Sequence, residues 1–219
     1  SYATGSLNLL PDGEPAPAPD AATTRELRLA LTRIAEQAGR AGKVIHSVRD
    51  LVRQRSTARA AAAPRALIDT ILPLVLLQAH KLAVSVRVEA PANLPLVWCE
   101  PTMIEQVLLN LARNALQAMD GQPGPRVLQL RARALPEPGR ATVVEFSVAD
   151  RGVGITEAVA AQLYTPFFTT KPEGMGLGLS LCRTVIEQHG STLHHQPNAP
   201  RGTEFRFALP LADRQGDAT

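Results

Sequence analysis

The sequence predicts an α+β fold that is preceded by a helical segment with coiled-coil spacing. From Leu27 to Val52, apolar residues recur at alternating steps of four and three, which is typical of a helix that packs along one narrow seam. After Pro64 the apolar pattern switches between helical spacing and the period of two that marks half-buried strands. A glycine-rich segment, residues 174–180, lies among these elements and leads into a helix.

Composition favours one medium-sized domain with an appendage. The chain has 219 residues, of which 45% are hydrophobic, and this is enough for a core. The net charge of +3 comes without a lysine-rich tail or interleaved aromatics, so no nucleic-acid partner is indicated. Cys99 and Cys182 are far apart, which predicts free thiols in a reducing compartment. No stretch has the length of a membrane span, so we expect a cytoplasmic location.

The first 58 residues predict part of a helical hairpin. Residues 1–10 have the spacing of the end of a first helix, and the proline-rich residues 11–22 predict a loop. A second helix follows, with a seam that it cannot bury alone and that would pair in a homodimeric four-helix bundle. That seam consists of Leu27, Leu31, Ile34, Ala38, Ala41, Ile45, Val48 and Val52.

The rest of the chain predicts a linker at 59–64, a domain at 65–211 and a disordered tail at 212–219. Helical spacing and good first-turn residues predict helices, and alternation predicts strands. The expected helices are residues 65–82, with Pro73 inside, 101–119 and 179–189. The expected strands are residues 84–88, 127–134, 141–149, 192–195 and 203–209.

One flank of the predicted helix 101–119, beside its buried apolar stripe, carries amide side chains that do not contribute to that stripe. Asn110, Asn114 and Gln117 lie along this flank, and asparagine is a poor residue for a helix interior. Two amide oxygens one turn apart could hold a hard cation such as Mg²⁺, and Arg113 could add a phosphate contact. The alternative interpretation is a pair of ordinary surface amides.

Three further motifs predict contacts with a nucleotide. Asp150 follows a strand and precedes Gly152 and Gly154, so its carboxylate could accept from an exocyclic amine while a flat base lies on the glycine turn. Residues 164–171 have the composition of a lid, with Phe167 and Phe168 expected to pin it. Lys171 would then be free to meet a terminal phosphate.

The glycine segment that follows suits phosphate. Gly174, Gly176 and Gly178 run into a helix N-terminus, whose unpaired N–H groups and partial positive charge attract anions. The segment matches neither the P-loop nor the dinucleotide fingerprint. Taken alone, a glycine turn before an ordinary helix explains it equally well, and an ordinary strand-to-loop turn explains the Asp150 motif.

Taken in order, these motifs resemble the ATP-binding domain of sensor histidine kinases. The resemblance covers roughly Pro64 to Leu211 and extends to the wider GHKL family of topoisomerase, chaperone and mismatch-repair ATPases. It implies the two-layer α/β sandwich called the Bergerat fold, which is a mixed sheet with helices on one face. ATP would bind between the lid and the helices.

The resemblance also assigns roles by position. It implies that Asn114 is the Mg²⁺ ligand with Asn110 supporting, that Asp150 binds the adenine amine and that Thr203 borders the adenine. Catalysis would fall to Asn110, Asn114 and Lys171. The full set of ATP-binding residues that it implies is Asn110, Arg113, Asn114, Gln117, Asp150, Gly152, Gly154, Ile155, Thr170, Lys171, Gly174, Gly176, Leu177, Gly178, Leu179 and Thr203.

One position separates the kinases of this family from its ATPases. The ATPases have a glutamate general base one turn before the Mg²⁺ asparagine, and here that residue is Asn110, which cannot accept a proton from water. This favours a protein-histidine kinase of a two-component system. The γ-phosphoryl group of ATP would pass to a histidine and then to the receiver domain of a response regulator.

The acceptor histidine of the family lies on the first hairpin helix and precedes an acidic residue. The chain contains no such pair, so we interpret its five histidines as ordinary core or surface residues and expect the acceptor upstream of Ser1. We therefore expect a fragment that binds ATP without phosphorylating itself. Its dimerisation would be weakened or lost, and membrane contact would come only through a preceding region that anchors the longer protein. The five histidines are His46, His80, His189, His194 and His195.

Two other functions stay open at this point. The first is a serine kinase of the same family that phosphorylates a partner protein. The second is a non-catalytic nucleotide-binding module that serves as a dimer scaffold.

Overall fold

A computed structural model describes residues 22, 24–35, 58–136, 143–171 and 174–212. The chain divides into two compact units, residues 1–55 and 56–219. In the first unit residues 24–35 are helical, as the heptad spacing predicts, and Leu31 of the seam is 61% exposed. The expected first helix, most of the loop 11–22, the seam beyond residue 35 and residues 213–219 of the tail lie outside the described residues.

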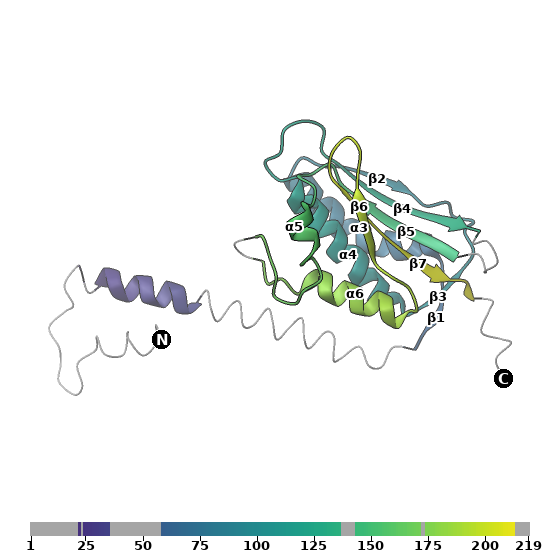
Figure 1. Ribbon diagram of the computed structural model, residues 1–219, viewed down its shortest axis with the longest axis horizontal. Coiled ribbons are helices and arrows are strands. Elements are labelled where there is room, and N and C mark those ends of the chain that lie inside the picture. Colours follow the sequence, from purple (N-terminus) through teal and green to yellow (C-terminus); the bar gives the residue numbers. More distant parts are fainter. Residues whose placement is uncertain (1–21, 23, 36–57, 137–142, 172–173, 213–219) are drawn as a thin grey trace. The chain divides into compact units, whose positions relative to one another are not determined.

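The second unit is built on a five-stranded mixed sheet with the order β2-β4-β5-β7-β6 (Figure 1). Strand β2 pairs in parallel with β4, and the other three pairings are antiparallel. The strands are β2 (Ser85–Glu89), β4 (Val127–Leu135), β5 (Val143–Ala149), β6 (His194–Pro197) and β7 (Thr203–Pro210). The bounds of all five strands as predicted from the sequence differ from these observed bounds by at most two residues at each described end.

Three long helices, α3, α4 and α6, lie together on one face of the sheet (Figure 1). The side chains that point to this face from neighbouring strands are apolar and buried. Phe146 of β5 and Phe207 of β7 pair in register and stack with ring centroids 5.3 Å apart. The helices are α3 (Pro64–Lys81), α4 (Pro101–Ala118) and α6 (Gly178–Gln188), with a short α5 (Glu157–Ala160). Burial of the apolar side chains between the helices and the sheet, rather than helix propensity, stabilises the helical layer.

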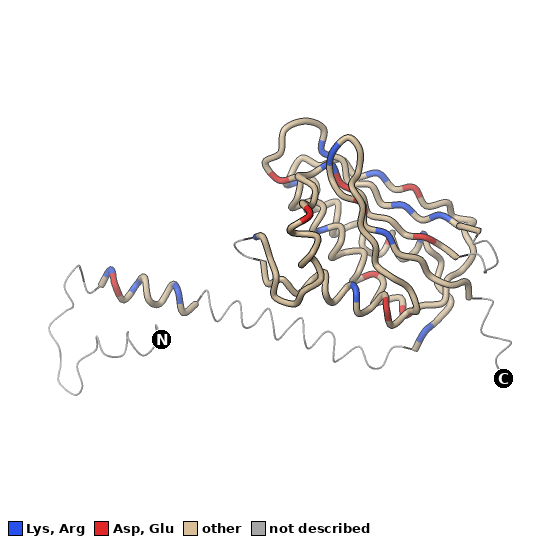
Figure 2. The backbone as a smooth tube through the Cα atoms, in the orientation of Figure 1, with Lys and Arg blue, Asp and Glu red and all other residues tan. Residues whose placement is uncertain are grey.

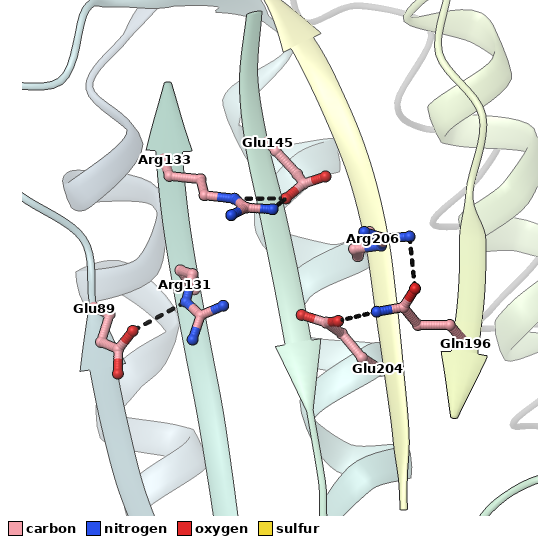
Figure 3. A network of polar contacts seen from close by, with 7 residues as sticks. All are labelled: Glu89, Arg131, Arg133, Glu145, Gln196, Glu204 and Arg206. Atoms are coloured by element: carbon pink, nitrogen blue, oxygen red, sulfur yellow. Dashed lines mark hydrogen bonds and ion pairs between the residues drawn. The ribbon is translucent and has the colours of Figure 1, made fainter. Parts of the chain in front are cut away.

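The opposite face of the sheet is polar and carries both signs of charge. Figure 2 shows basic and acidic residues interspersed along these strands. Cross-strand ion pairs join Arg131 to Glu89 at 2.9 Å and Arg133 to Glu145 at 2.8 Å. The contacts continue across β7 and β6 through the residues labelled in Figure 3, namely Gln196, Glu204 and Arg206. Together with the apolar face, this alternation gives the expected two-layer α/β sandwich.

Two short strands depart from the expected elements. Residues Ala60–Ala62, inside the predicted linker, form β1 and pair antiparallel with β3 (Val97–Cys99), which the sequence did not predict. Alanine has little strand propensity, and a three-residue strand shows no periodicity, so neither element has a sequence signal. The pairing attaches the beginning of the unit to its core, because Val97 and Cys99 are fully buried.

Helix α4 is the element that positions the site. Pro101 at its first position has a fixed φ that suits a helix start, and Glu100 precedes it as the N-cap residue. Its apolar stripe contacts α3, α6 and the sheet, with Ile104, Leu108 and Leu111 at most 1% exposed. The amide flank is therefore held at a fixed orientation beside α6.

Candidate functional site

The amide flank of α4 meets the lid through a lysine. The Nζ atom of Lys171 donates to Oδ1 of Asn114 at 3.2 Å and to Oε1 of Gln117 at 2.6 Å. These residues are more than fifty positions apart in the sequence, so only the fold brings them together. The lysine ammonium therefore binds the oxygen of Asn114, which the sequence singled out as a cation ligand, and that of Gln117 on the same flank.

The surroundings of Lys171 disfavour its charge. Burial lowers the pKa of its ammonium, and the charge of Arg113 on α4 lowers it further. Its two acceptors are neutral amides, which compensate an ammonium only in part. A polyanion in this place would be attracted by both cations at once.

Asn110 lies one turn before Asn114 and packs against the beginning of α6. A Cβ atom at Gly178 would lie 2.7 Å from Oδ1 of Asn110 and 2.8 Å from its Nδ2. Only glycine permits this close approach of the α6 backbone to the amide. The Nδ2 atom of Asn110 donates to Sγ of the buried Cys182 at 3.1 Å.

The segment before α6 is fixed by its backbone. Gly176 has a φ of +66°, which other residues adopt at a cost, and its carbonyl accepts from the Phe167 N–H at 2.9 Å. Of the two phenylalanines expected to pin the lid, Phe167 does not, since it is 68% exposed and its own φ is +67°, whereas Phe168 is half-buried. Thr169 makes a local turn instead, because its Oγ1 accepts from the Lys171 N–H at 3.1 Å.

The base of the lid is anchored by Tyr164. Its hydroxyl donates to the Leu193 carbonyl at 3.2 Å, and the guanidinium of Arg183 on α6 lies 5.3 Å from the ring centroid. Burial raises the pKa of Tyr164 to about 12, so the hydroxyl stays protonated and can donate. The sequence assigned this role to the phenylalanines that follow.

Asp150 lies at the end of β5 and is 4% exposed. Its Oδ1 accepts from the Gly152 N–H at 2.7 Å and from the Thr203 N–H at 3.3 Å. Burial raises the pKa of this carboxyl, while the two backbone N–H groups lower it. Both of these hydrogen bonds are made by Oδ1, so Oδ2 is the oxygen that could accept a hydrogen bond from a ligand.

The loop after Asp150 contacts the C-terminal end of α4. The Val153 N–H donates to the Ala118 carbonyl at 3.2 Å. Asn198, in the turn between β6 and β7, donates from Nδ2 to the Asp150 carbonyl at 2.7 Å. Because Asn114 precedes Ala118 by four residues, the two parts of the site are separated by about 6 Å along the helix axis. One elongated ligand could contact both.

The structure groups most of the predicted residues around α4. They form three groups: Asn110 lies against Gly178, Lys171 donates to both Asn114 and Gln117, and Asp150 accepts from Gly152 and Thr203. Thr170 is exposed, Leu177 is buried, and the remaining members are half-buried or exposed along the same segments: Arg113, Gly154, Ile155, Gly174 and Leu179. Cys182 and Asn198 support these residues from positions that no motif marks, and Tyr164 does so from the first position of the expected lid.

Comparisons with known proteins relate the chain to a known family. The family model of histidine kinase-, DNA gyrase B- and HSP90-like ATPases matches residues 99–213. The chain is 39% identical over 96% of its length to the C4-dicarboxylate transport sensor protein DctS of Rhodobacter capsulatus, covering 30% of that protein. It is 37% identical over 87% of its length to the sensor protein FixL of Bradyrhizobium diazoefficiens, covering 37% of it. The chain thus spans about a third of the length of these curated relatives.

Solved structures give the same result. The catalytic domain of histidine kinase ThkA matches with a TM-score of 0.61 at 30% identity, over 70% of this chain and 95% of that domain. Full-length ShkA shares the fold with a TM-score of 0.65 at 21% identity, over 96% of this chain and 45% of that protein. The chain therefore belongs to the family of histidine kinase-, DNA gyrase B- and HSP90-like ATPases, and it carries the ATP-binding catalytic domain of a sensor histidine kinase.

Proposed function

We propose that the chain binds ATP with Mg²⁺ along α4 and transfers the γ-phosphoryl group to a histidine, from which a response regulator takes it. The observation that carries the proposal is the contact of Lys171 with Asn114 and Gln117. It places a cation from the lid on the amide oxygens of α4, beside the N-terminus of α6. A triphosphate with its metal would replace contacts that the fold already makes.

At the base end, Asp150 supplies the selectivity for adenine. With Oδ1 held by two backbone N–H groups, Oδ2 faces a ligand and accepts from the exocyclic amine of adenine. A guanine base has a carbonyl at that position, so its oxygen and the Asp150 carboxylate would face each other as two hydrogen-bond acceptors. Thr203, which donates to Asp150 through its backbone, borders the same place.

At the phosphate end, the donor set fits Mg²⁺. Amide oxygens are hard ligands, and a cation bound chiefly by phosphates and water needs few of them. Asn114 would hold the ion with Asn110 supporting it, and Mg²⁺ would neutralise charge on the transferred group. Because two cations cannot share one amide oxygen closely, Lys171 leaves Asn114 and meets the γ-phosphate.

Asn110 decides where the phosphoryl group goes. A water molecule needs a base to become a nucleophile, and a carboxamide cannot take its proton. Asn110 contacts Gly178 and the thiol of Cys182, and neither of these groups supplies a base. Transfer to an imidazole, which is itself a nucleophile, needs positioning more than activation. This favours a histidine acceptor over hydrolysis.

The binding half of the proposal is tested by Asn114→Ala. Alanine favours the helix, so the fold should persist while calorimetric affinity for ATP in Mg²⁺ falls at least tenfold. The matched control is Gln106→Ala, an exposed amide on the same helix, which should bind as the unaltered chain does. Equal affinities for all three proteins would contradict the assignment of Asn114.

The transfer half is tested with γ-labelled ATP and the acceptor protein. Acid-labile phosphate on a histidine supports a histidine kinase, and acid-stable phosphate on a partner supports a serine kinase instead. A chain that shows no nucleotide affinity would be a scaffold. Steady release of inorganic phosphate by the chain alone would contradict the role given to Asn110.

A further inference from the structure

We propose that Cys182 is a positioning residue for Asn110: its sulfur holds the amide nitrogen, so that the amide oxygen is presented to the metal-bound phosphates. The inference rests on the proposed function, because it concerns how Asn110 supports Mg²⁺. It adds a residue of α6 to a task so far given to α4 alone.

The thiol lies between the two helices with both of its hydrogen-bonding functions in use. Sγ accepts from Nδ2 of Asn110 at 3.1 Å and donates to the Val107 carbonyl of α4 at 3.9 Å. Cys182 is 3% exposed, so its thiol is shielded from solvent. Its two contacts tie the sulfur to the α4 backbone on one side and to the Asn110 side chain on the other.

An asparagine side chain needs such a device because its two ends have almost the same shape. Only the oxygen can face a cation, whereas the NH₂ group would be repelled by it. In Asn110 the sulfur fixes the NH₂ end. The Gly178 backbone packs against the amide about equally near its oxygen and its nitrogen, so this packing confines the amide, and the sulfur contact distinguishes its two ends. Rotation of the amide by half a turn would place the NH₂ group toward the ligand and break the N–H···S contact.

The competing explanation treats Cys182 as a small apolar residue that fills a gap between α4 and α6. Free cysteine is commonly buried for that reason alone. The two explanations differ in what they expect of Mg²⁺. A packing role affects nucleotide binding with or without the metal, whereas an orienting role affects only the part of the affinity that depends on Mg²⁺.

The experiment compares Cys182→Ala and Cys182→Ser in the full 219-residue chain. Affinity for ATP is measured by calorimetry over a Mg²⁺ series and in excess chelator. Cys182→Ala should raise the Mg²⁺ concentration for half-maximal effect about tenfold, the lower end of what loss of an outer-shell partner costs. Its affinity in chelator should stay at the level of the unaltered chain. Serine keeps an acceptor in place and should restore most of the Mg²⁺ response.

Cys99→Ala is the matched control. Cys99 is equally buried, but it lies on β3 and has no contact with Asn110 among the described residues. Its loss should leave the Mg²⁺ response unchanged. The inference is overturned if Cys182→Ala responds to Mg²⁺ as the unaltered chain does, or if it loses affinity equally with and without the metal. A lack of Mg²⁺-dependent binding in the unaltered chain would overturn the proposed function as well.

A measurement on the unaltered chain keeps the inference testable if the alanine variant does not fold. The side-chain amide protons of Asn110 should exchange with solvent more slowly than those of the exposed Gln106, because one of them is held by a buried sulfur. Nuclear magnetic resonance resolves both groups. Equal exchange rates would contradict a fixed amide.

Discussion

At the scale of single residues, Asp150 combines selectivity with a cost to stability. Burial raises the pKa of its carboxyl despite two backbone donors, so the folded state favours the protonated acid. A raised pKa in the folded state adds stability below the pKa of the unfolded chain. That stability is lost as the pH rises through the folded pKa. At neutral pH the carboxylate is therefore retained for what it binds and not for what it stabilises.

Asp150→Asn should separate these two effects. The variant removes a buried charge, so its free energy of unfolding should exceed that of the unaltered chain at neutral pH. The difference should shrink toward acid pH, where the aspartate is protonated. Urea unfolding at several pH values measures this. A variant that is less stable at neutral pH would contradict the role of burial.

The same variant should invert base selectivity. Its amide nitrogen would face the adenine amine, donor against donor, so ATP should bind about 10- to 100-fold more weakly, as expected for losing a hydrogen bond to a charged group. The affinity for inosine triphosphate, which has an oxygen at that position, should rise relative to the affinity for ATP. Asp120→Asn, at an exposed position after α4, is the control and should change neither affinity.

Lys171 should discriminate ATP from ADP. Lys171→Met keeps the apolar stem but removes the ammonium that would meet the γ-phosphate. ATP should bind about tenfold more weakly. ADP, which lacks that group and no longer has to displace the lysine from Asn114, should bind equally well or more tightly. Calorimetry with both nucleotides measures the ratio, and Lys81→Met at an exposed position controls for the loss of charge. An equal loss for ADP would contradict the γ-phosphate contact.

At the scale of elements, α6 is fastened at both ends. Its first residue, Gly178, packs on Asn110, and beyond its last turn His189 reaches the beginning of α4. The Nδ1 atom of His189 contacts the Val185 carbonyl at 2.7 Å, and its Nε2 accepts from the Glu100 N–H at 3.0 Å. Nδ1 therefore carries the ring proton, and the neutral imidazole satisfies two backbone groups of two helices.

His189→Ala should destabilise the fold by about 1–3 kcal/mol, because it removes the acceptor of the Glu100 N–H and opens a cavity where the buried ring lay. The midpoint of urea unfolding would fall accordingly. His194→Ala, an exposed position on β6, should have almost no effect. Equal stability of the two variants would show that the contact with Glu100 contributes nothing.

The sequence predicted the elements that have their own periodicity and missed those that depend on a partner. Alternating valines around Val86 marked β2, and the amide flank around Asn114 marked the site. In contrast, β1 is a run of alanines that becomes a strand only through its pairing with β3. Cys182 and Asn198 support Asn110 and Asp150 from 72 and 48 residues away, so no local pattern identifies them. Phe167 is a case in which the sequence signal misled: this apolar residue of the lid was expected to anchor it, but the residue is exposed.

At the scale of the whole molecule, the catalytic unit should be independent of the residues before it. All the contacts of the proposed site lie within the compact unit 56–219. A chain of residues 56–219 should therefore unfold cooperatively and bind ATP in Mg²⁺ with the affinity of the full chain, as calorimetry can establish. Loss of binding on truncation would show that the first unit completes the site. Described helices among residues 58–212 include none that is long and apolar enough to cross a bilayer.

The same truncation tests the proposed dimer. The heptad seam from Leu27 predicts self-association through residues 1–58, and Leu31 exposes much of its side chain in the described helix. Sedimentation of the full chain should depend on concentration, whereas that of residues 56–219 should not. If the full chain and residues 56–219 were both monomeric, the result would contradict the prediction that the heptad seam mediates dimerisation.

The contact between Lys171 and the amides of α4 has a kinetic consequence. In the proposed site the phosphates would replace the amide oxygens as the partners of Lys171, so the lysine must be released before the phosphates are fully engaged. At high nucleotide concentration the observed association rate should then level off at the rate of that release. Diffusion would set the speed only at low concentration, and the lid would set the upper limit.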